Sequence, residues 1–166
     1  MVDKRKFKDI NVSLLGLGTM RLPCETEQKR ESNRNIDYDK AQSLVDLAYK
    51  NGVNYFDTAY MYHCGKSEAF IGYALNKYPR DTYFIADKLP IWLCDTKEDM
   101  KRVFEKQLER TGMDYFDFYL LHSLDNENFE KCEKFYAYDF LKKMQKEGKI
   151  KYIGFSFHGT VDDLRN

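Results

Sequence analysis

The chain has 166 residues, of which 43% are hydrophobic and 16% aromatic, a composition that fits a folded domain rather than a disordered segment. Lysine and arginine number 27, as do aspartate and glutamate, so a net charge of zero gives no electrostatic basis for nucleic-acid or anionic-membrane binding. No signal peptide is visible and no apolar run approaches ~20 residues, and the four scattered cysteines indicate reduced thiols, so we expect a cytoplasmic protein.

The first third of the chain contains two predicted strands and one helix. Val12–Leu17 is a short apolar run and predicts the first strand, which a polar loop over Cys24–Asn35 follows. The apolar periodicity of Asp39–Lys50 predicts a helix that ends at an Asn-Gly pair. Val53–Phe56 predicts the second strand.

The middle of the chain repeats the alternation of helix and strand. Ser67–Tyr78 predicts a helix in which Ser67 is the cap, and Thr82–Ala86 predicts the third strand. Thr96–Arg110 predicts a helix that begins with a capping pattern and ends near Gly112.

The last part continues the same pattern. Tyr115–Leu121 predicts the fourth strand, and a polar loop leads to a helix over Tyr138–Lys146. Ile150–Phe155 predicts the fifth strand, and Thr160 has the features of the cap of a further helix.

A polar residue follows each of the last four predicted strands, at Asp57, Lys88, His122 and Ser156, which lie 31, 34 and 34 residues apart. This spacing is that of a repeated strand-plus-helix unit, whose strands run parallel and place their C-terminal ends on one face. We therefore predict an α/β fold, a partial (β/α)8 barrel with about five parallel strands and four helices. A doubly wound open sheet is the alternative, although such a sheet gathers its site at one switch point.

Three of these residues and one tyrosine could act together as an acid. Asp57 precedes Tyr62 by five residues, and an ammonium at Lys88 would stabilise the phenolate that Tyr62 leaves after donating a proton. Asp57 can keep Lys88 charged, and His122 can donate a hydrogen bond to a substrate oxygen. This set suits protonation of an oxygen that gains negative charge, as carbonyl reduction by hydride requires.

Each of these residues also has an ordinary structural interpretation. Asp57 could be a helix cap, Tyr62 a packing residue, Lys88 a solvated loop residue and His122 a hydrogen-bonded core residue. A Gly-Leu-Gly sequence ends at Gly18, but the third glycine of a dinucleotide fingerprint would fall at Arg21. No metal-ligand spacing links the histidines, and we predict no metal site.

Five segments resemble the aldo-keto reductases in order and spacing. They are Gly16–Arg21, Asn54–Tyr62, Asp87-Lys88, Asp114–His122 and Gly148–Ser156. The resemblance covers nearly the whole chain and implies that residues 1–166 are the N-terminal part of a reductase barrel domain. It also implies NAD(P)H-dependent reduction of an aldehyde or ketone.

The resemblance assigns roles residue by residue. It implies a catalytic set of Asp57, Tyr62 as general acid, Lys88 and His122, and contacts of NADP(H) or NAD(H) with Gly18, Thr19, Met20 and Ser156. Met20–Pro23 and Gly154–Gly159 resemble a bacterial branch that often carries a ferredoxin-like iron–sulfur domain. A cluster would belong to such an extension, and none is expected in this chain.

The family closes eight strands, so the resemblance also implies that this chain is a truncated form with weak or no activity alone. We expect a small carbonyl substrate, no nucleic-acid or membrane partner, and a homodimer through the open edges of the barrel. Two alternatives remain: a non-catalytic half-barrel that serves as a binding module, and a barrel enzyme that forms a Schiff base at Lys88.

Overall fold

The computed structural model describes residues 1–25 and 35–165, and its centre is a parallel five-stranded sheet. The strands are β3 (Leu17–Gly18), β4 (Tyr55–Asp57), β5 (Phe84–Leu89), β6 (Phe116–Leu124) and β7 (Ile150–Phe157). They lie side by side in chain order. This order has no reversal, so it excludes the doubly wound alternative and confirms the partial-barrel topology.

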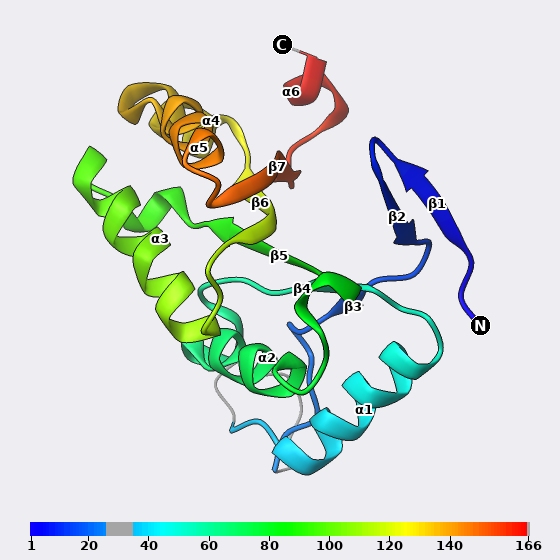
Figure 1. Cartoon of the computed structure of the whole chain (residues 1–166). Helices are drawn as coiled ribbons and strands as arrows, with labels where there is room; N and C mark the ends of the chain where they lie inside the picture. The colour runs from blue at the N-terminus through cyan, green and yellow to red at the C-terminus, as the bar shows by residue number, and fades with distance from the viewer. Residues whose placement is uncertain (26–34, 166) are drawn as a thin grey trace.

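Helices occur between consecutive strands of the sheet, as the crossover connections of parallel strands require. They are α1 (Tyr38–Lys50), α2 (Ser67–Leu75), α3 (Lys97–Thr111), α4 (Asn126–Phe135), α5 (Ala137–Lys146) and α6 (Val161–Arg165). Short 3-10 turns occur at η1 (Tyr62–Gly65), η2 (Arg80–Thr82) and η3 (Ile91–Leu93). Figure 1 shows the larger helices arranged in an arc along one side of the sheet. None of the helices in the described ranges is long and apolar enough to cross a membrane.

The core lies between the sheet and this arc of helices. Every second residue of the central strands points toward the helices, and Phe56, Ile85 and Tyr119 are fully buried there. Phe70 of α2 and Phe104 of α3 pack against them. The opposite face of the sheet is more open, because the side chains of Tyr55, Phe84, Phe118 and Leu120 are only half-buried.

Local sequence sets both ends of α3 as predicted. Thr96 accepts a hydrogen bond from the Asp99 amide, and the Asp99 carboxylate accepts from the Thr96 amide in return, which completes a capping box at the start of α3. Gly112 ends α3 in the left-handed conformation, at a φ of 64°.

The prediction for the first strand was wrong in its bounds. Val12–Leu17 is split between β2 (Ile10–Ser13), which forms an antiparallel hairpin with β1 (Lys4–Phe7), and the two-residue strand β3. The β1 strand was missed because all four of its side chains are exposed, so it has no alternation of polar and apolar residues. Phe7 packs against Phe118 and Tyr152, so the hairpin covers part of the open face.

The count of four helices was too low. The polar loop predicted before Tyr138 contains α4, which begins with Asp125 accepting a hydrogen bond from the Asn128 amide. Only Cys132 and Phe135 of α4 are buried, and two apolar positions give too weak a periodicity to predict a helix.

Three further details differ from the prediction. Ser67 is the first residue of α2 rather than its cap, and α2 ends at Leu75. Lys88, His122 and Ser156 lie within β5, β6 and β7 rather than after them, because β5 runs from Phe84 to Leu89 instead of Thr82–Ala86 and all three strands continue past these residues. The predicted loop over Cys24–Asn35 lies mostly outside the described residues.

Candidate active site

Lys88 is the centre of a polar cluster at the C-terminal end of the sheet. Its side chain is buried, and its Nζ lies 2.7 Å from Asp57 Oδ1, 2.7 Å from the Thr58 carbonyl oxygen and 3.2 Å from the Tyr62 hydroxyl. An ammonium group has three N–H donors, and these three acceptors hold it in one orientation. The neighbouring strands β4 and β5 supply Asp57 and Lys88, as the predicted convergence requires.

Asp57 is the charge partner of Lys88. Its side chain retains 27% exposure, which leaves one edge of the carboxylate open to the face of the site. Burial raises the pKa of Asp57, while the charge of Lys88 and its hydrogen bond oppose that rise. The pair therefore holds opposite charges at 2.7 Å in a largely enclosed position.

A strained turn carries Tyr62 to this cluster. The next residues, His63 and Cys64, both have left-handed backbone conformations, with φ of 52° and 54°. Such values are rare outside glycine and require support from the surrounding structure. The Leu22 amide supplies it by donating to His63 Nε2 at 3.2 Å, so the segment after β3 fixes the turn that presents Tyr62.

His122 completes the set through ring contacts. Its imidazole packs edge-on against Tyr62 at a centroid distance of 6.1 Å and against Trp92 at 4.9 Å. Burial, together with the charges of Lys88 and His158, lowers the pKa of His122 to about 4. His122 is therefore neutral near pH 7, and its buried Nδ1 has no hydrogen-bond partner among the described residues.

The four predicted cofactor residues occupy different environments. Gly18 lies beside Asp57 in the sheet and faces open space, and Met20 is half exposed. Thr19 is fully buried: its hydroxyl donates to the Asp57 carbonyl oxygen at 2.9 Å and accepts from Ser67 Oγ at 2.6 Å. Its side chain therefore supports the cluster. Ser156 Oγ accepts from the Ser123 amide at 2.7 Å, a bond that does not use the hydroxyl proton of Ser156.

Sequence reasoning missed Trp92, whose ring lies beside His122. Trp92 is the single tryptophan of the chain and lies in η3, just after β5, so its position in the strand-to-helix loop was the available signal. Sequence reasoning also missed two acids buried behind Lys88, Asp87 and Glu68. An acid within an apolar strand and another near the start of an apolar helix were the signals there.

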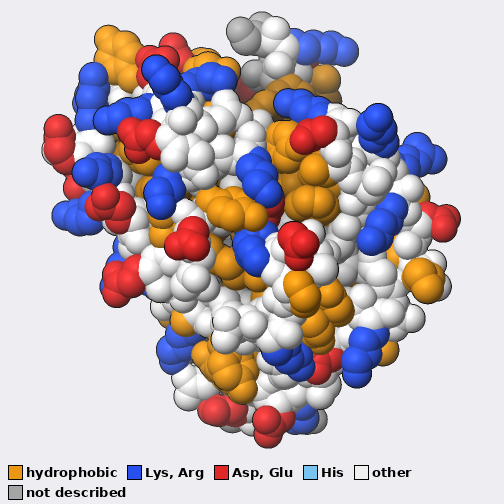
Figure 2. Space-filling model, viewed as in Figure 1, with side chains coloured by type: hydrophobic (Ala, Val, Ile, Leu, Met, Phe, Trp, Pro, Cys, Tyr) orange, Lys and Arg blue, Asp and Glu red, His pale blue; other side chains and the backbone are white. Residues whose placement is uncertain are grey.

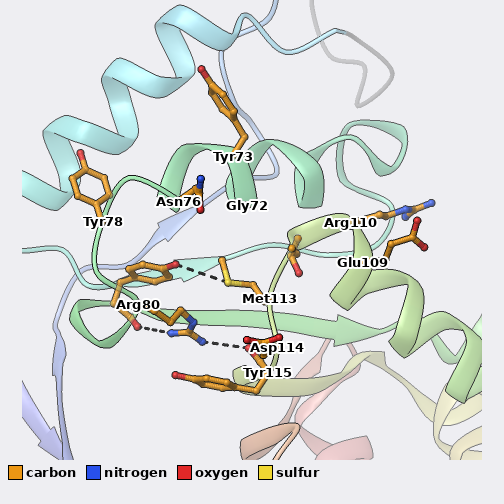
Figure 3. Close-up of a pocket in the computed structure, with 13 residues that line it drawn as sticks. Gly72, Tyr73, Asn76, Tyr78, Arg80, Glu109, Arg110, Met113, Asp114 and Tyr115 are labelled. Carbon is orange, nitrogen blue, oxygen red and sulfur yellow. Dashed lines mark hydrogen bonds between the residues drawn. The ribbon is translucent and has the colours of Figure 1, made fainter.

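A separate groove lies at the opposite end of the sheet. Its volume is about 470 Å³, and Figure 3 shows it between the last turns of α2 and α3 and the segments that precede β5 and β6. Arg80 lines this groove and donates hydrogen bonds to the carbonyl oxygens of Tyr83 and Tyr115 and to the Asp117 carboxylate. Arg80 and the polar groups around it are hydrogen-bonded to one another, so they are less available to a ligand. The cluster around Lys88 is therefore the better candidate for the active site.

No group of three or more histidine, cysteine, aspartate or glutamate residues is placed to hold a metal ion within residues 1–25 and 35–165. None of the four cysteines, which all lie within the described residues, forms a disulfide bond, and Cys94 and Cys132 are buried.

Comparison with known proteins identifies the family. The sequence profile of the Aldo/keto reductase family matches residues 14–166. The chain is 32% identical over 163 residues to an aldo-keto reductase of Gibberella moniliformis, covering 94% of this chain and 46% of that protein. It is 28% identical to the NADH-specific methylglyoxal reductase of Escherichia coli, covering 88% and 48% of the two chains.

A solved aldo-keto reductase of Klebsiella pneumoniae in complex with NADPH superposes with a TM-score of 0.72 at 26% identity, covering 99% of this chain and 52% of that one. The chain thus spans about half the length of the relatives it matches. The profile match, the shared strand order and the cluster at the strand ends lead to one conclusion: the chain belongs to the aldo/keto reductase family.

Proposed function

We propose that this chain carries the proton-donating part of an NAD(P)H-dependent reductase of aldehydes or ketones, with Tyr62 as general acid. The observation that carries the proposal is the position of Lys88 Nζ, 3.2 Å from the Tyr62 hydroxyl and 2.7 Å from Asp57 Oδ1. An ammonium so placed stabilises the phenolate that remains when Tyr62 has given its proton away.

The residues divide the acid–base work among them. Reduction adds a hydride to the carbonyl carbon and a proton to the carbonyl oxygen, which yields an alcohol, and a bound NAD(P)H supplies the hydride. Tyr62 donates the proton to the oxygen as that atom gains negative charge. His122 is neutral and carries one N–H, which can be donated to the same oxygen and orient the substrate beside Tyr62.

The cofactor-binding residues support the same proposal. The open space at Gly18, the exposed Met20 and the hydroxyl proton of Ser156 could contact a nicotinamide nucleotide at the C-terminal ends of the strands. Relatives of this chain include both an NADH-specific enzyme and an NADPH complex, so we propose NAD(P)H without choosing between them. We further propose that residues 1–166 are the N-terminal part of a barrel domain and that this part alone has weak or no activity.

The Schiff-base alternative fits the cluster less well. A lysine that attacks a carbonyl needs a free amine lone pair, and the three acceptors around Lys88 Nζ favour the charged ammonium. Borohydride trapping of a carbonyl substrate on Lys88 would favour that alternative. A lack of reductase activity in every form of the protein would instead favour a non-catalytic binding module.

The test of the proposal is the substitution Tyr62→Phe in a full-length version that contains the whole barrel domain, which removes the transferable proton and retains the ring. We expect kcat to fall ~10²–10⁴-fold, the usual contribution of general acid catalysis. Tyr73→Phe is the matched control, because Tyr73 is 62% exposed on α2 and lies away from the cluster, and it should retain the original kcat. Nucleotide binding, followed by fluorescence, should not change in either variant. A Tyr62→Phe variant with near-normal kcat would remove Tyr62 from the role.

A further inference from the structure

A group of polar side chains is buried directly behind Lys88. Strand β5 places Lys88 toward the candidate active site and Asp87 toward the helices, because neighbouring side chains of a strand point to opposite faces. Asp87 has no exposed surface, and neither do Glu68 of α2 and Gln107 of α3, which surround it together with Tyr119 of β6. Buried carboxyl groups are rare unless they are paired, so the presence of two of them at this position needs a physical explanation.

The buried group holds the main chain of Lys88 at both of its polar atoms. The Lys88 amide donates to Asp87 Oδ1 at 2.8 Å. The Lys88 carbonyl oxygen accepts from Gln107 Nε2 at 3.0 Å, and the same nitrogen donates to Glu68 Oε1 at 2.9 Å. Tyr119 in turn donates its hydroxyl hydrogen to Gln107 Oε1, which fixes the orientation of that amide. The position of Lys88 in the strand is therefore tied to both acids.

The charges of this region balance only if Asp87 carries no charge. Arg110 Nη1 lies 2.9 Å from Glu68 Oε2, and Lys88 Nζ lies 2.7 Å from Asp57 Oδ1, so each cation already has a carboxylate partner. An ionised Asp87 would be a third buried anion without a cation of its own, which is costly in a low-dielectric interior. Its Oδ2 has no hydrogen-bond partner among the described residues, so no donor stabilises a negative charge on that oxygen.

The neighbouring charges point to Asp87 rather than Glu68 as the protonated acid. Burial and the nearby charge of Glu68 raise the pKa of Asp87 well above its usual range, and Asp57 adds to this while the Lys88 amide and charge oppose it. Burial also raises the pKa of Glu68, but the hydrogen bonds and charge of Arg110, the hydrogen bond of Gln107 and that of Asp87 oppose the rise. Burial raises the pKa of Tyr119 well above its usual range, so its hydroxyl stays neutral.

We propose that Asp87 is a protonated carboxylic acid at neutral pH and that it acts as a positioning residue for Lys88. The acid pair and Gln107 fix the backbone of Lys88 on one side of β5. On the other side the Lys88 ammonium must lie within hydrogen-bond distance of both Asp57 and Tyr62. The protonation state stands on the buried geometry alone, whereas the catalytic consequence rests on the proposed function.

Infrared spectroscopy tests the protonation state without any activity. A protonated carboxyl group has a C=O stretching band that ionised carboxylates lack. We expect this band in the wild-type protein at pH 7 and its loss in Asp87→Asn. Asp117→Asn is the matched control, because Asp117 is equally buried but is paired with Arg80 at 2.7 Å and Lys151 at 2.9 Å, and this variant should retain the band.

Unfolding of the wild-type protein provides a second infrared test of the protonation state, without any variant. The band should disappear when the protein is unfolded in denaturant at pH 7, because an exposed aspartic acid is ionised there. A wild-type spectrum without the band, or a band that persists in a folded Asp87→Asn variant, would overturn the proposal.

Kinetics test the positioning role. In a full-length version that contains the whole barrel domain, Asp87→Ala removes the acid. A small displacement of a catalytic group can cost about 10²-fold, so we expect kcat to fall by about that factor with KM changed only a few-fold. Asp87→Asn retains an acceptor for the Lys88 amide and adds no buried charge, so it should restore most of the lost kcat. An Asp87→Ala variant with wild-type kcat would refute the positioning role. If Tyr62→Phe left kcat unchanged while the infrared band behaved as expected, the proposed function alone would fail.

Discussion

At the scale of single residues, the candidate active site depends on how charges are neutralised in a partly enclosed space. Lys88 is 6% exposed and Asp57 27% exposed, so neither charge is fully solvated and each depends on the other. Removing one member of such a pair leaves the other uncompensated, which costs more than the pair itself contributes. The Asp57–Lys88 pair therefore affects both the stability of the fold and the chemistry of the candidate active site.

A double-mutant cycle on Asp57 and Lys88 measures that dependence. We expect Asp57→Asn and Lys88→Met each to lower the free energy of unfolding, and the double variant to lose less than the sum of the two. The expected coupling energy is about 1–3 kcal/mol, measured by denaturant unfolding. The exposed pair Lys101 and Glu105, 3.6 Å apart on α3, is the control and should couple by only about 0.3–0.5 kcal/mol. Strictly additive losses at Asp57 and Lys88 would mean that the two charges do not interact.

The low pKa of His122 predicts how stability depends on pH. In the unfolded chain a histidine takes up a proton near pH 6.5, whereas the pKa of His122 in the fold is about 4. The unfolded state therefore binds more protons between these values, so the contribution of His122 is fully present above pH 6.5 and is lost as the pH falls toward 4. The slope is at most about 1.4 kcal/mol per pH unit.

The substitution His122→Gln should reduce this pH dependence. We expect the variant and the wild type to differ in the slope of unfolding free energy against pH between about 4 and 6.5, and to run parallel above pH 7. Equal slopes in the acid range would show that His122 is protonated as readily in the fold as in the unfolded chain.

At the scale of elements, the close approach of α2 and α3 sets the position of the helices behind the site. Gly72 of α2 lies against the last turn of α3, where an added Cβ would lie 2.1 Å from the Thr111 carbonyl oxygen. A backbone atom cannot move aside as a flexible side chain can. The glycine is therefore required by packing, although it lowers the intrinsic helix propensity of α2 by ~1 kcal/mol. Glu68 and Arg110, one on each of these helices, form an ion pair across the same contact.

Replacement of Gly72 by alanine tests this contact. Gly72→Ala should lower the free energy of unfolding by at least about 1–3 kcal/mol, because overpacking outweighs the gain in helix propensity. Gly154→Ala is the control, since its Cβ would meet only the end of the Leu120 side chain, at 2.9 Å, and that side chain can change its rotamer. Thermal or denaturant unfolding of both variants measures the difference. A Gly72→Ala variant as stable as the wild type would show that the helices separate at little cost.

At the scale of the whole molecule, the sheet has two edges and one partly open face. Strands β3 and β7 are its outermost members, and β7 carries Phe155, which is 53% exposed. Figure 2 shows hydrophobic side chains exposed in the middle of the viewed face, with charged side chains around them. The β1–β2 hairpin covers part of the open face of the sheet, but Tyr55, Phe84 and Leu120 remain only half-buried. Free strand edges and exposed apolar surface favour association with another chain.

We therefore expect this chain to form a dimer or a larger assembly when produced alone. Size exclusion with light scattering should give a mass above the 19.8 kDa of one chain and a dependence on concentration. Phe155→Lys places a charge on the free edge of β7 and should shift the population toward monomer. Phe129→Lys is the control, because Phe129 is equally exposed but lies on α4, and it should leave the assembly unchanged. A stable wild-type monomer would show that the edges do not associate.

The sequence predicted the repeat and the site better than the limits of the elements. Apolar runs at regular intervals predicted the five parallel strands, and the polar residues near the C-terminal ends of these runs identified Asp57, Lys88 and His122. The structure brings these together with Tyr62, while their catalytic roles stay predictions. The β1 strand and α4 were missed because their side chains are mostly exposed and carry little periodic signal. The bacterial branch and its iron–sulfur extension also stay predictions.

What the sequence determined by itself was local: where most strands and helices occur, how α3 begins and ends, and which polar residues lie near the C-terminal ends of the strands. The tertiary structure alone decided how groups distant in the chain meet. Glu68, Asp87, Gln107 and Tyr119 come from four separate elements, and no spacing in the sequence indicates that they share one buried space. The physical reason is that the pKa of Asp87 and the orientation of Lys88 depend on burial and on through-space charge, and both exist only after the helices have packed against the sheet.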